Sequence, residues 1–339
     1  MKTILVTGGA GFIGSHLSEA LLKQGHRVII LDNFNNYYDP AIKRNNVTEI
    51  RKTMEANDIA SDKLKLIEGD IRNKELLTEL FQEDIHKVVH LAAMAGVRYS
   101  IEQPELYYDV NITGTLNLLE KCKEKHIKSF VFASSSSVYG NNDKVPFSES
   151  DAVDNPISPY AATKKSGELL CHTYHHLFDI NIACLRFFTV YGPRQRPDLA
   201  IHKFTKLIAE GKAIPFYGDG STERDYTYVE DIISGILAAI NYVDSPEKRF
   251  DVFNLGGDKT VSLVDLVKTI EAALGKDAIL NKMPMQPGDV NRTNADLTKS
   301  RAILGFAPQT KFSDGIGKFV EWWNCGDRPL ENMETVRRI

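Results

Sequence analysis

A glycine-rich turn near the start of the chain constrains its fold more than any other feature. Residues 3–7 (TILVT) form a short apolar, β-branched stretch that is typical of a buried strand. Residues 8–14 (GGAGFIG) follow at once, and a helical pattern then continues to Gly25. Glycines spaced G-x-G-x-x-G between a strand and a helix allow a tight turn and the close approach of a pyrophosphate to the backbone. The chain is therefore predicted to begin with a dinucleotide-binding unit.

An acid at the end of the next predicted strand indicates which dinucleotide is bound. That strand covers residues 27–31 and ends at Asp32. The acid follows the glycines by about 20 residues, the distance expected for a ligand of the adenosine ribose hydroxyls. Its carboxylate would repel a 2′-phosphate, and Asn33 rather than an arginine comes next. These residues favour NAD over NADP as the cofactor.

Strand and helix patterns alternate along the first half of the chain. Further strand-like segments cover residues 63–70, 88–93, 130–133 and 182–187. This alternation predicts an α/β fold, a Rossmann doubly wound parallel sheet, whose ligands bind beyond the C-terminal ends of the strands. The residues expected to contact the cofactor there are Gly8, Gly11, Phe12, Ile13, Gly14, Asp32, Asn33, Asp70, Ile71, Leu91, Ala92 and Ala93.

The chain changes character after its sixth predicted strand. The pattern is less regular from residue 186 onward, although residues 250–255 look like a strand that returns to the sheet. We expect an NAD-binding Rossmann domain over residues 1–185, with a returning segment near residues 226–257. A smaller C-terminal α/β domain that binds the substrate is expected over residues 186–339.

Composition excludes several classes of partner. The 339 residues are 42% hydrophobic and 25% charged, with a formal net charge of −4, so neither nucleic acid nor an anionic membrane is expected as a partner. No apolar run reaches the roughly 20 residues that span a bilayer. The first predicted strand follows Met1 so closely that no signal peptide is expected. The four cysteines show no metal-ligand spacing, so we expect no metal site and a cytoplasmic protein with reduced thiols.

A candidate base lies at the predicted start of a helix, in residues 158–164 (SPYAATK). Ser158 can cap this helix, and Pro159 suits its first turn. Tyr160 and Lys164 are four residues apart, so both side chains should point the same way. A lysine one turn from a tyrosine is expected to lower the pKa of the phenol and to yield a base near neutral pH. Taken alone the spacing is a weak signal, because solvated helices carry it by chance.

The order of these features resembles the extended short-chain dehydrogenase/reductases. The glycine turn, Asp32, the serines at 134–137 and the pair Tyr160 and Lys164 follow one another as in that family. Residues 186–193 (RFFTVYGP), 224–226 (RDY) and 287–289 (PGD) are similar to its sugar-nucleotide branch. The resemblance implies that the C-terminal domain binds a nucleotide sugar. It also implies a homodimer formed through the helices near residues 107–125 and 159–179.

The same resemblance implies catalytic roles for three residues. Tyr160 would take a proton from a sugar hydroxyl as hydride moves to NAD. Lys164 would hold the nicotinamide ribose and lower the pKa of the tyrosine, so both residues are also expected to contact the cofactor. Ser135, counted back from residues 138–140 (VYG), would hydrogen-bond the reacting oxygen.

The residues after that serine narrow the reaction. Dehydratases of this branch usually carry an Asp-Glu pair there, and decarboxylases a Glu just before Val-Tyr-Gly. This chain has Ser136 and Ser137 at those positions, so elimination and decarboxylation lack their proton-transfer group. The resemblance therefore implies epimerisation at C4. Hydride leaves C4, the keto sugar turns over, and hydride returns to the other face.

The sugar is expected to be UDP-glucuronate. Residues 95–100 (AGVRYS) and 186–204 are most similar to UDP-glucuronate 4-epimerases, which convert it to UDP-galacturonate. A glucuronate carboxylate needs hydrogen-bond donors, and the candidates are Ser136, Ser137 and Thr189, with Arg98 or Arg196. Hydroxyl donors could also hold the carboxylate out of the alignment that decarboxylation needs.

The remaining substrate contacts and the alternatives follow from the same resemblance. Arg224 is expected at the diphosphate, and Gln286 and Asp289 at the uridine ribose. Arg98 can equally be a solvated or structural arginine. A UDP-glucose or UDP-N-acetylglucosamine 4-epimerase is the first alternative, since Thr293 is small enough to admit an N-acetyl group. A non-catalytic NAD-binding protein is the second, although such proteins commonly lose the tyrosine or the lysine.

Overall fold

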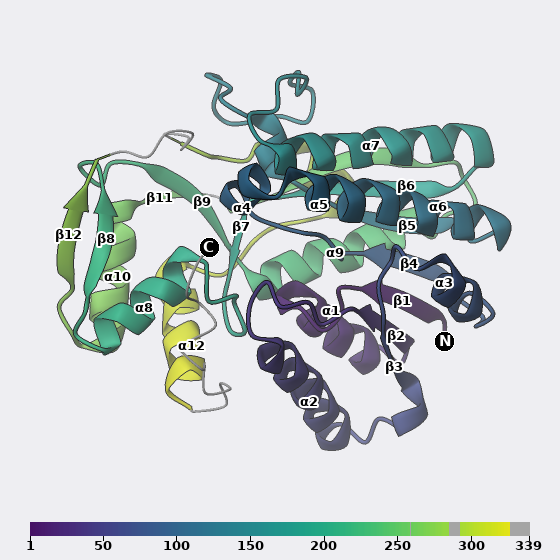
Figure 1. The fold of residues 1–339 in the computed structure, drawn as a ribbon, viewed down its shortest axis with the longest axis horizontal. Coiled ribbons are helices and arrows are strands. Elements are labelled where there is room, and N and C mark those ends of the chain that lie inside the picture. The colour runs from purple at the N-terminus through teal and green to yellow at the C-terminus, as the bar shows by residue number, and fades with distance from the viewer. Residues whose placement is uncertain (258, 285–291, 326–339) are drawn as a thin grey trace.

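The computed structural model describes residues 1–257, 259–284 and 292–325, and its centre is a parallel sheet of seven strands (Figure 1). The strand order is β10-β6-β5-β4-β1-β2-β3, and neighbouring strands run parallel throughout. From β1 the sheet grows through β2 and β3 in one direction and through β4, β5 and β6 in the other, and this reversal of strand order between β1 and β4 confirms the predicted Rossmann doubly wound fold. The strands are β1 (Thr3–Thr7), β2 (Arg27–Asp32), β3 (Leu64–Glu68), β4 (Lys87–His90), β5 (Ser129–Ser135), β6 (Asn181–Phe187) and β10 (Phe250–Leu255).

Helices cover both faces of this sheet (Figure 1). Ile4 and Val6 of β1 pack in one core with α1, α2 and α9, whereas Leu5 packs in the other core with α3, α6 and α7. Alternate residues of a strand point to opposite faces, and because both faces are buried the strands read as unbroken apolar runs. These helices are α1 (Phe12–Lys23), α2 (Pro40–Ala56), α3 (Lys74–Leu80), α6 (Gly114–Glu124), α7 (Pro159–Phe178) and α9 (Val229–Val243).

Two smaller sheets and their helices lie beside the C-terminal ends of the central strands (Figure 1). One sheet has the order β11-β9-β7, and the other pairs β12 with β8. The predicted domain boundary at residue 186 falls inside β6, and the division into two domains stays a prediction. The elements here are β7 (Thr189–Tyr191), α8 (Ala200–Ala209), β8 (Ala213–Tyr217), β9 (Glu223–Tyr228), β11 (Thr260–Ser262), α10 (Leu263–Leu274), β12 (Ile279–Met283), α11 (Thr298–Leu304) and α12 (Phe312–Asn324).

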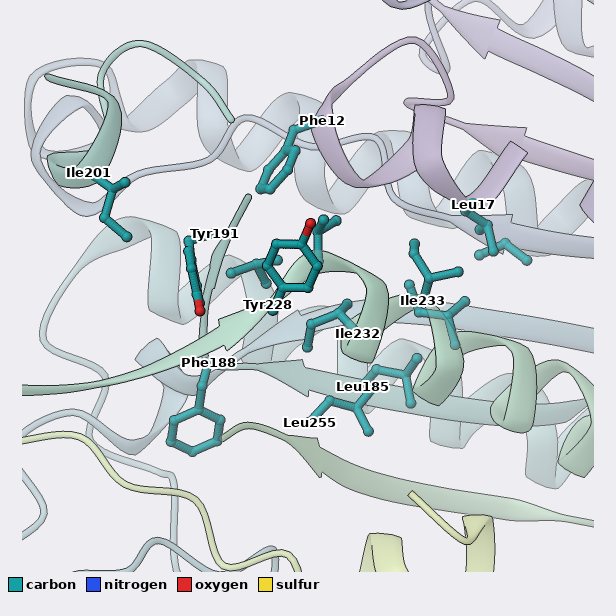
Figure 2. Packing of buried hydrophobic residues seen from close by; sticks show 14 of the residues in the cluster. Phe12, Leu17, Leu185, Phe188, Tyr191, Ile201, Tyr228, Ile232, Ile233 and Leu255 are labelled. Carbon is teal, nitrogen blue, oxygen red and sulfur yellow. The ribbon is translucent and has the colours of Figure 1, made fainter. Parts of the chain in front are cut away.

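One continuous apolar core joins these smaller sheets to the central sheet. Figure 2 shows Phe12 of α1 and Ile232 of α9 in the same cluster as Tyr191 of β7 and Tyr228 of β9. Burying a large apolar side chain stabilises a fold by roughly 1.5–3 kcal/mol. Several such residues from each part therefore hold the two regions in a fixed arrangement, with the ends of the central strands between them.

One helical segment differs from its prediction. The long helix expected near residues 107–125 is interrupted, because α5 (Pro104–Tyr108) passes through a π-helical turn over Asp109–Thr113 before α6 begins. Two short helices, α4 (Val97–Glu102) and the 3₁₀ turn η3 (Ser136–Tyr139), border the site described below. No helix in the described part of the chain is both long enough and apolar enough to cross a bilayer.

Candidate active site

A cavity of about 500 Å³ opens at the C-terminal ends of the central strands. Its walls come from the turn after β1, the ends of β2, β4, β5 and β6, and the first turn of α7. This is where a doubly wound sheet binds its ligands. The predicted site residues that line the cavity are Gly8, Gly11, Phe12, Ile13, Gly14, Asp32, Asn33, Asp70, Ile71, Leu91, Ala92, Ala93, Ser135, Ser136, Ser137, Tyr160, Lys164, Thr189 and Arg196.

Four predicted substrate residues are not among those that line the cavity. Arg98 on α4 is exposed, and its guanidinium carbon lies 6.0 Å from the ring centroid of Tyr217. Arg224 on β9 donates a hydrogen bond from Nη1 to the Glu223 carbonyl at 3.0 Å. Gln286 and Asp289 lie outside the described residues. The roles expected for these four residues stay predictions.

The glycine turn packs closely against the end of β4. Gly8 has a φ of +68°, and a Cβ atom on it would lie 2.8 Å from the backbone nitrogen of Ala92. A Cβ atom on Gly14 would lie 2.2 Å from the Gly8 carbonyl oxygen. No side chain caps the start of α1 at Gly11, so the N–H groups of its first turn remain for a ligand. This geometry suits the pyrophosphate of a dinucleotide.

Asp32 at the end of β2 forms an ion pair that was not predicted. Its Oδ1 accepts hydrogen bonds from the Phe34 backbone at 3.0 Å and from Lys43 Nζ at 3.1 Å. Both side chains of the pair are almost fully buried, and Lys43 lines the cavity. Oδ2 of Asp32 has no partner among the described residues, so one carboxylate oxygen remains for a ribose hydroxyl.

Asp70, the other acid that lines the cavity, is fixed by neighbouring side chains. Burial raises the pKa of Asp70, but hydrogen bonds from Arg72 and Asn33 outweigh it and hold the pKa at about 2. The Arg72 guanidinium donates to both carboxylate oxygens at 2.9 Å, and Asn33 Nδ2 donates at 2.9 Å. The carboxylate is therefore ionised at neutral pH and keeps little capacity for further ligands.

Helix α7 places the candidate base and its lysine in the cavity wall. Ser158 Oγ accepts a hydrogen bond from the Ala161 backbone at 3.1 Å, which confirms the predicted cap. Lys164 is buried, and its Nζ donates to the Ala133 carbonyl at 2.7 Å and lies 6.0 Å from the Tyr160 ring centroid. Burial lowers the pKa of Lys164 to about 8, although Cys171 and Glu168 act in the opposite direction.

The pKa of Tyr160 differs from the expectation. Lys164 was expected to lower it, but burial of the phenol raises it. The opposing contributions come from a hydrogen bond with Ser135 and from the charge of Arg196. The reason is the direction of Lys164, whose ammonium points to the Ala133 carbonyl. Among the protein's own groups, Ser135 and Arg196 are therefore those that favour the phenolate.

The serines at 134–137 differ in their hydrogen-bond partners. Ser135 ends β5, and its Oγ accepts a hydrogen bond from the Ser137 backbone and is hydrogen-bonded to Ser137 Oγ, both at 3.2 Å. Ser134 donates instead to Glu168 on α7 at 2.6 Å. Among the described residues that line the cavity, the acids are Asp32 and Asp70. Asp32 ends β2 and Asp70 follows β3, so both lie at the opposite end of the cavity from Tyr160. The serines thus offer hydroxyl groups without a neighbouring carboxylate.

A buried ion pair lies behind the serines. Glu168 accepts from Arg186 Nε and Nη2, both at 2.9 Å, and the two side chains are only 5% and 3% exposed. Arg186 Nη1 also bonds the Tyr139 hydroxyl at 3.0 Å, and that hydroxyl donates to Asn254 on β10 at 2.7 Å. This network joins α7 to β5, β6 and β10 directly behind the candidate catalytic residues.

The loop after β7 brings a charged group to the same end of the cavity. Arg196 donates to Asp198 through Nε at 3.1 Å and through Nη2 at 2.9 Å. Its guanidinium carbon lies 5.4 Å from the ring centroid of Tyr37, which also lines the cavity. Tyr37 and Tyr38 were not predicted, since tyrosines between two polar residues have no pattern that marks a ligand contact.

Known proteins share both the sequence and the architecture of this chain. The family model described as GDP-mannose 4,6 dehydratase matches residues 5–319. UDP-glucuronate 4-epimerase 4 of Arabidopsis thaliana is 46% identical over 95% of this chain and 75% of its own length. The solved UDP-glucuronic acid 4-epimerase of Bacillus cereus, in complex with UDP-glucuronic acid and NAD, is 40% identical with a TM-score of 0.83, over 94% of this chain and 98% of that one.

An enzyme with another sugar in its name is similar as well. The solved UDP-N-acetylglucosamine 4-epimerase of Methanobrevibacter ruminantium, in complex with UDP-N-acetylmuramic acid, is 33% identical with a TM-score of 0.82, over 95% of this chain and 98% of that one. The order of glycine turn, serine run and tyrosine–lysine pair, together with these matches, leads to one conclusion. The chain belongs to the extended short-chain dehydrogenase/reductases, in the nucleotide-sugar family that the GDP-mannose 4,6 dehydratase model describes.

Proposed function

We propose that this protein is an NAD-dependent UDP-sugar 4-epimerase that interconverts UDP-glucuronate and UDP-galacturonate through a transient 4-keto sugar. The observation that carries the proposal is the group at one end of the cavity: Tyr160 and Lys164 beside three serines, with no carboxylate among them. UDP-glucuronate 4-epimerases match nearly the whole of this chain, and this similarity supports the same function.

The residues present fit NAD as the cofactor. The glycine turn and the uncapped start of α1 would hold the pyrophosphate. Asp32 has one carboxylate oxygen without a protein partner, which suits a ribose hydroxyl and disfavours a 2′-phosphate. Lys164 would meet the nicotinamide ribose. When bound, NAD supplies the hydride acceptor for C4 and the donor that returns the hydride to the other face.

Tyr160 is the proposed base. Its phenol would take the proton of the sugar O4 hydroxyl and return it after the sugar has turned over. Ser135, whose hydrogen bond already favours the phenolate, would also bond the sugar oxygen. The ammonium of Lys164, which the Ala133 carbonyl holds in place, would favour ionisation of the phenol once NAD and the sugar are bound.

The sugar carboxylate is assigned to hydroxyl donors and one arginine. Ser136, Ser137, Thr189 and Arg196 all line the cavity near Tyr160. Charge-assisted hydrogen bonds to a carboxylate are roughly twice as strong as neutral ones, so this cluster favours a uronate over a neutral sugar. Arg98 is the weaker candidate, because it is exposed and does not line the cavity.

The decisive experiment compares three substrates. Purified protein is incubated separately with UDP-glucuronate, UDP-glucose and UDP-N-acetylglucosamine, and the C4 epimers and any UDP-xylose are resolved by chromatography. We expect UDP-galacturonate to form fastest and no UDP-xylose to accumulate. Faster turnover of UDP-N-acetylglucosamine would instead support the alternative in which Thr293 admits the N-acetyl group. No turnover of any sugar would support a non-catalytic NAD-binding protein.

Two variants test the assigned residues. Tyr160→Phe should abolish turnover of UDP-glucuronate while NAD stays bound, because the ring remains but the proton acceptor is lost; persistent activity would exclude Tyr160 as the base. Thr189→Val should weaken the use of UDP-glucuronate more than that of UDP-glucose, because only the uronate needs the hydroxyl. Equal losses with both sugars would contradict the assignment of the carboxylate.

We also propose a homodimer in the cytoplasm. Apolar side chains are exposed on adjacent helices, among them Leu116 on α6, Leu169 on α7 (57% exposed) and Leu177 on α7 (61% exposed). A second copy that packs on these helices would cover them. Light scattering after size exclusion should give twice the chain mass, and Leu169→Glu should shift it to the monomer. The free thiols of Cys122, Cys171 and Cys184 are buried, which suits a reducing compartment.

A further inference from the structure

The loop between β7 and α8 carries an acid that holds the arginine of the candidate carboxylate site. Asp198 accepts two hydrogen bonds from Arg196, from Nε at 3.1 Å and from Nη2 at 2.9 Å. The pair is local, since a turn in which the Leu199 backbone donates to the Arg196 carbonyl at 3.2 Å brings the two side chains together. Such a pair uses one edge of the guanidinium and fixes its plane.

A tyrosine from the other side of the cavity completes the arrangement. The Arg196 guanidinium lies 5.4 Å from the ring centroid of Tyr37, which belongs to the loop between β2 and α2. Asp198 also interacts with the Tyr37 hydroxyl, and burial, followed by the charge of this acid, raises the pKa of Tyr37. Arg196 is thus held by a carboxylate at one edge of its guanidinium and lies over the ring of Tyr37.

The free donors of Arg196 lie on the side of the cavity. A guanidinium has five N–H donors, of which the pair with Asp198 uses one on Nε and one on Nη2. Nη1 has no hydrogen-bond partner within the described part of the chain. Arg196 and Tyr37 line the cavity but Asp198 does not, so the acid lies on the outer side of the guanidinium. The two nitrogens at the end of the fork remain for a ligand.

We propose that Asp198 is a positioning residue that sets the specificity of this site for acidic sugars, by holding Arg196 so that its free donors meet the sugar carboxylate end-on. The inference rests on the proposed function. If an arginine becomes ordered only when the substrate binds, the lost conformational entropy weakens substrate binding. An arginine that is already ordered avoids this cost. Asp198 therefore acts on substrate binding through Arg196 and takes no part in proton or hydride transfer.

The first test is Asp198→Asn, with UDP-glucuronate and UDP-glucose as substrates. The amide keeps the size of the side chain but loses the second acceptor and the charge. We expect the KM for UDP-glucuronate to rise about tenfold with kcat nearly unchanged, and the KM for UDP-glucose to stay within about twofold, where tenfold corresponds to about 1.4 kcal/mol. Asp198→Glu, which keeps the charge, should recover part of the loss.

Matched controls separate this role from general damage. Glu247→Gln breaks another carboxylate–arginine pair with the same two-residue spacing, with Arg249, on a loop that does not line the cavity. That variant should leave both KM values unchanged. Adding Asp198→Asn to an Arg196→Met variant should cause no further change in the ratio of the two KM values, because the acid would have nothing left to position.

The outcomes are distinct. If the wild type turns over UDP-glucose but not UDP-glucuronate, the proposed function fails before Asp198 is tested. If the wild type uses UDP-glucuronate, three results overturn the inference: equal changes for both sugars in Asp198→Asn, an unchanged or lower KM for UDP-glucuronate, or a full effect of Asp198→Asn in the Arg196→Met background. The expected tenfold, sugar-selective change that vanishes with Arg196→Met supports it.

Discussion

Replacing Glu168 by glutamine should destabilise the protein far more than the same change on its surface. Glu168 lies one turn after Lys164 on α7 and accepts three hydrogen bonds, two from Arg186 at 2.9 Å and one from Ser134 at 2.6 Å. Glutamine keeps the length of the side chain but turns one acceptor into a donor that faces a guanidinium. The charge of Arg186, only 3% exposed, would then be buried without compensation.

The size of the effect follows from this burial. Removing one partner of a buried ion pair costs about 3–5 kcal/mol, because the other charge stays desolvated. Unfolding entropy near the midpoint is about 2.1 cal/mol/K per residue, which for 339 residues gives about 0.7 kcal/mol/K. The midpoint of thermal unfolding should therefore fall by about 4 to 7 °C in Glu168→Gln.

Scanning calorimetry of the wild type, Glu168→Gln and Glu68→Gln would measure this. Glu68 pairs with Arg44 in the same two-oxygen manner, but both side chains are more than half exposed. Exposed pairs contribute about 0–1 kcal/mol, so the control should shift the midpoint by no more than about 1.5 °C. Equal shifts in the two variants would refute the reasoning, because burial would then not decide the cost.

Two further predictions concern the glycine turn and the buried histidines. Gly14→Ala should weaken NAD binding more than tenfold by titration calorimetry, because its Cβ would lie 2.2 Å from the Gly8 carbonyl, whereas Gly317→Ala in α12 meets nothing within 4 Å and should bind normally. Burial lowers the pKa of His16 and His90 to about 3, with smaller contributions from nearby cations, so the folded protein binds fewer protons than the unfolded chain below pH 6.5. Stability in urea should therefore fall as the pH drops from 6.5 to 5, by about 2 kcal/mol per histidine, and His16→Gln should remove about half of that loss; a wild type whose stability is flat over this range would contradict it.

Short, local sequence patterns were enough to predict some parts of the fold and of the site. The glycine turn needs only a strand, a few spaced glycines and a helix, and Tyr160 and Lys164 needed only a helix with a capping serine. Lys43 was missed although a local signal existed. It stands in helical register with Val47, Ile50 and Met54, so the buried face of α2 carries one cation. A lone lysine on an apolar stripe predicts a buried partner, which here is Asp32.

Contacts between distant segments were not predictable in the same way. Glu168 and Arg186 belong to different elements, and nothing in their spacing says that they pair. Spacing placed Lys164 on the face of Tyr160 but not the direction of its ammonium, which the Ala133 carbonyl decides. The pKa of a buried group depends on burial and on all its neighbours, so the effect of one lysine on one tyrosine could not be read from four residues of sequence.

The absence of an acid beside the serines bears on the base as well as on the choice of reaction. Epimerisation by hydride transfer at C4 needs one proton acceptor, and Tyr160, the proposed base, would have to give up its proton although burial raises its pKa. A carboxylate at Ser136 or Ser137 would add a like charge near the phenolate and raise that pKa further. It would also supply the second proton-transfer group that elimination needs. Hydroxyl groups and Arg196 have the opposite effect, because they favour the phenolate and can hold an acidic sugar without moving its protons. A carboxylate at either position would therefore supply the group that elimination needs and also weaken Tyr160 as the proposed base of epimerisation.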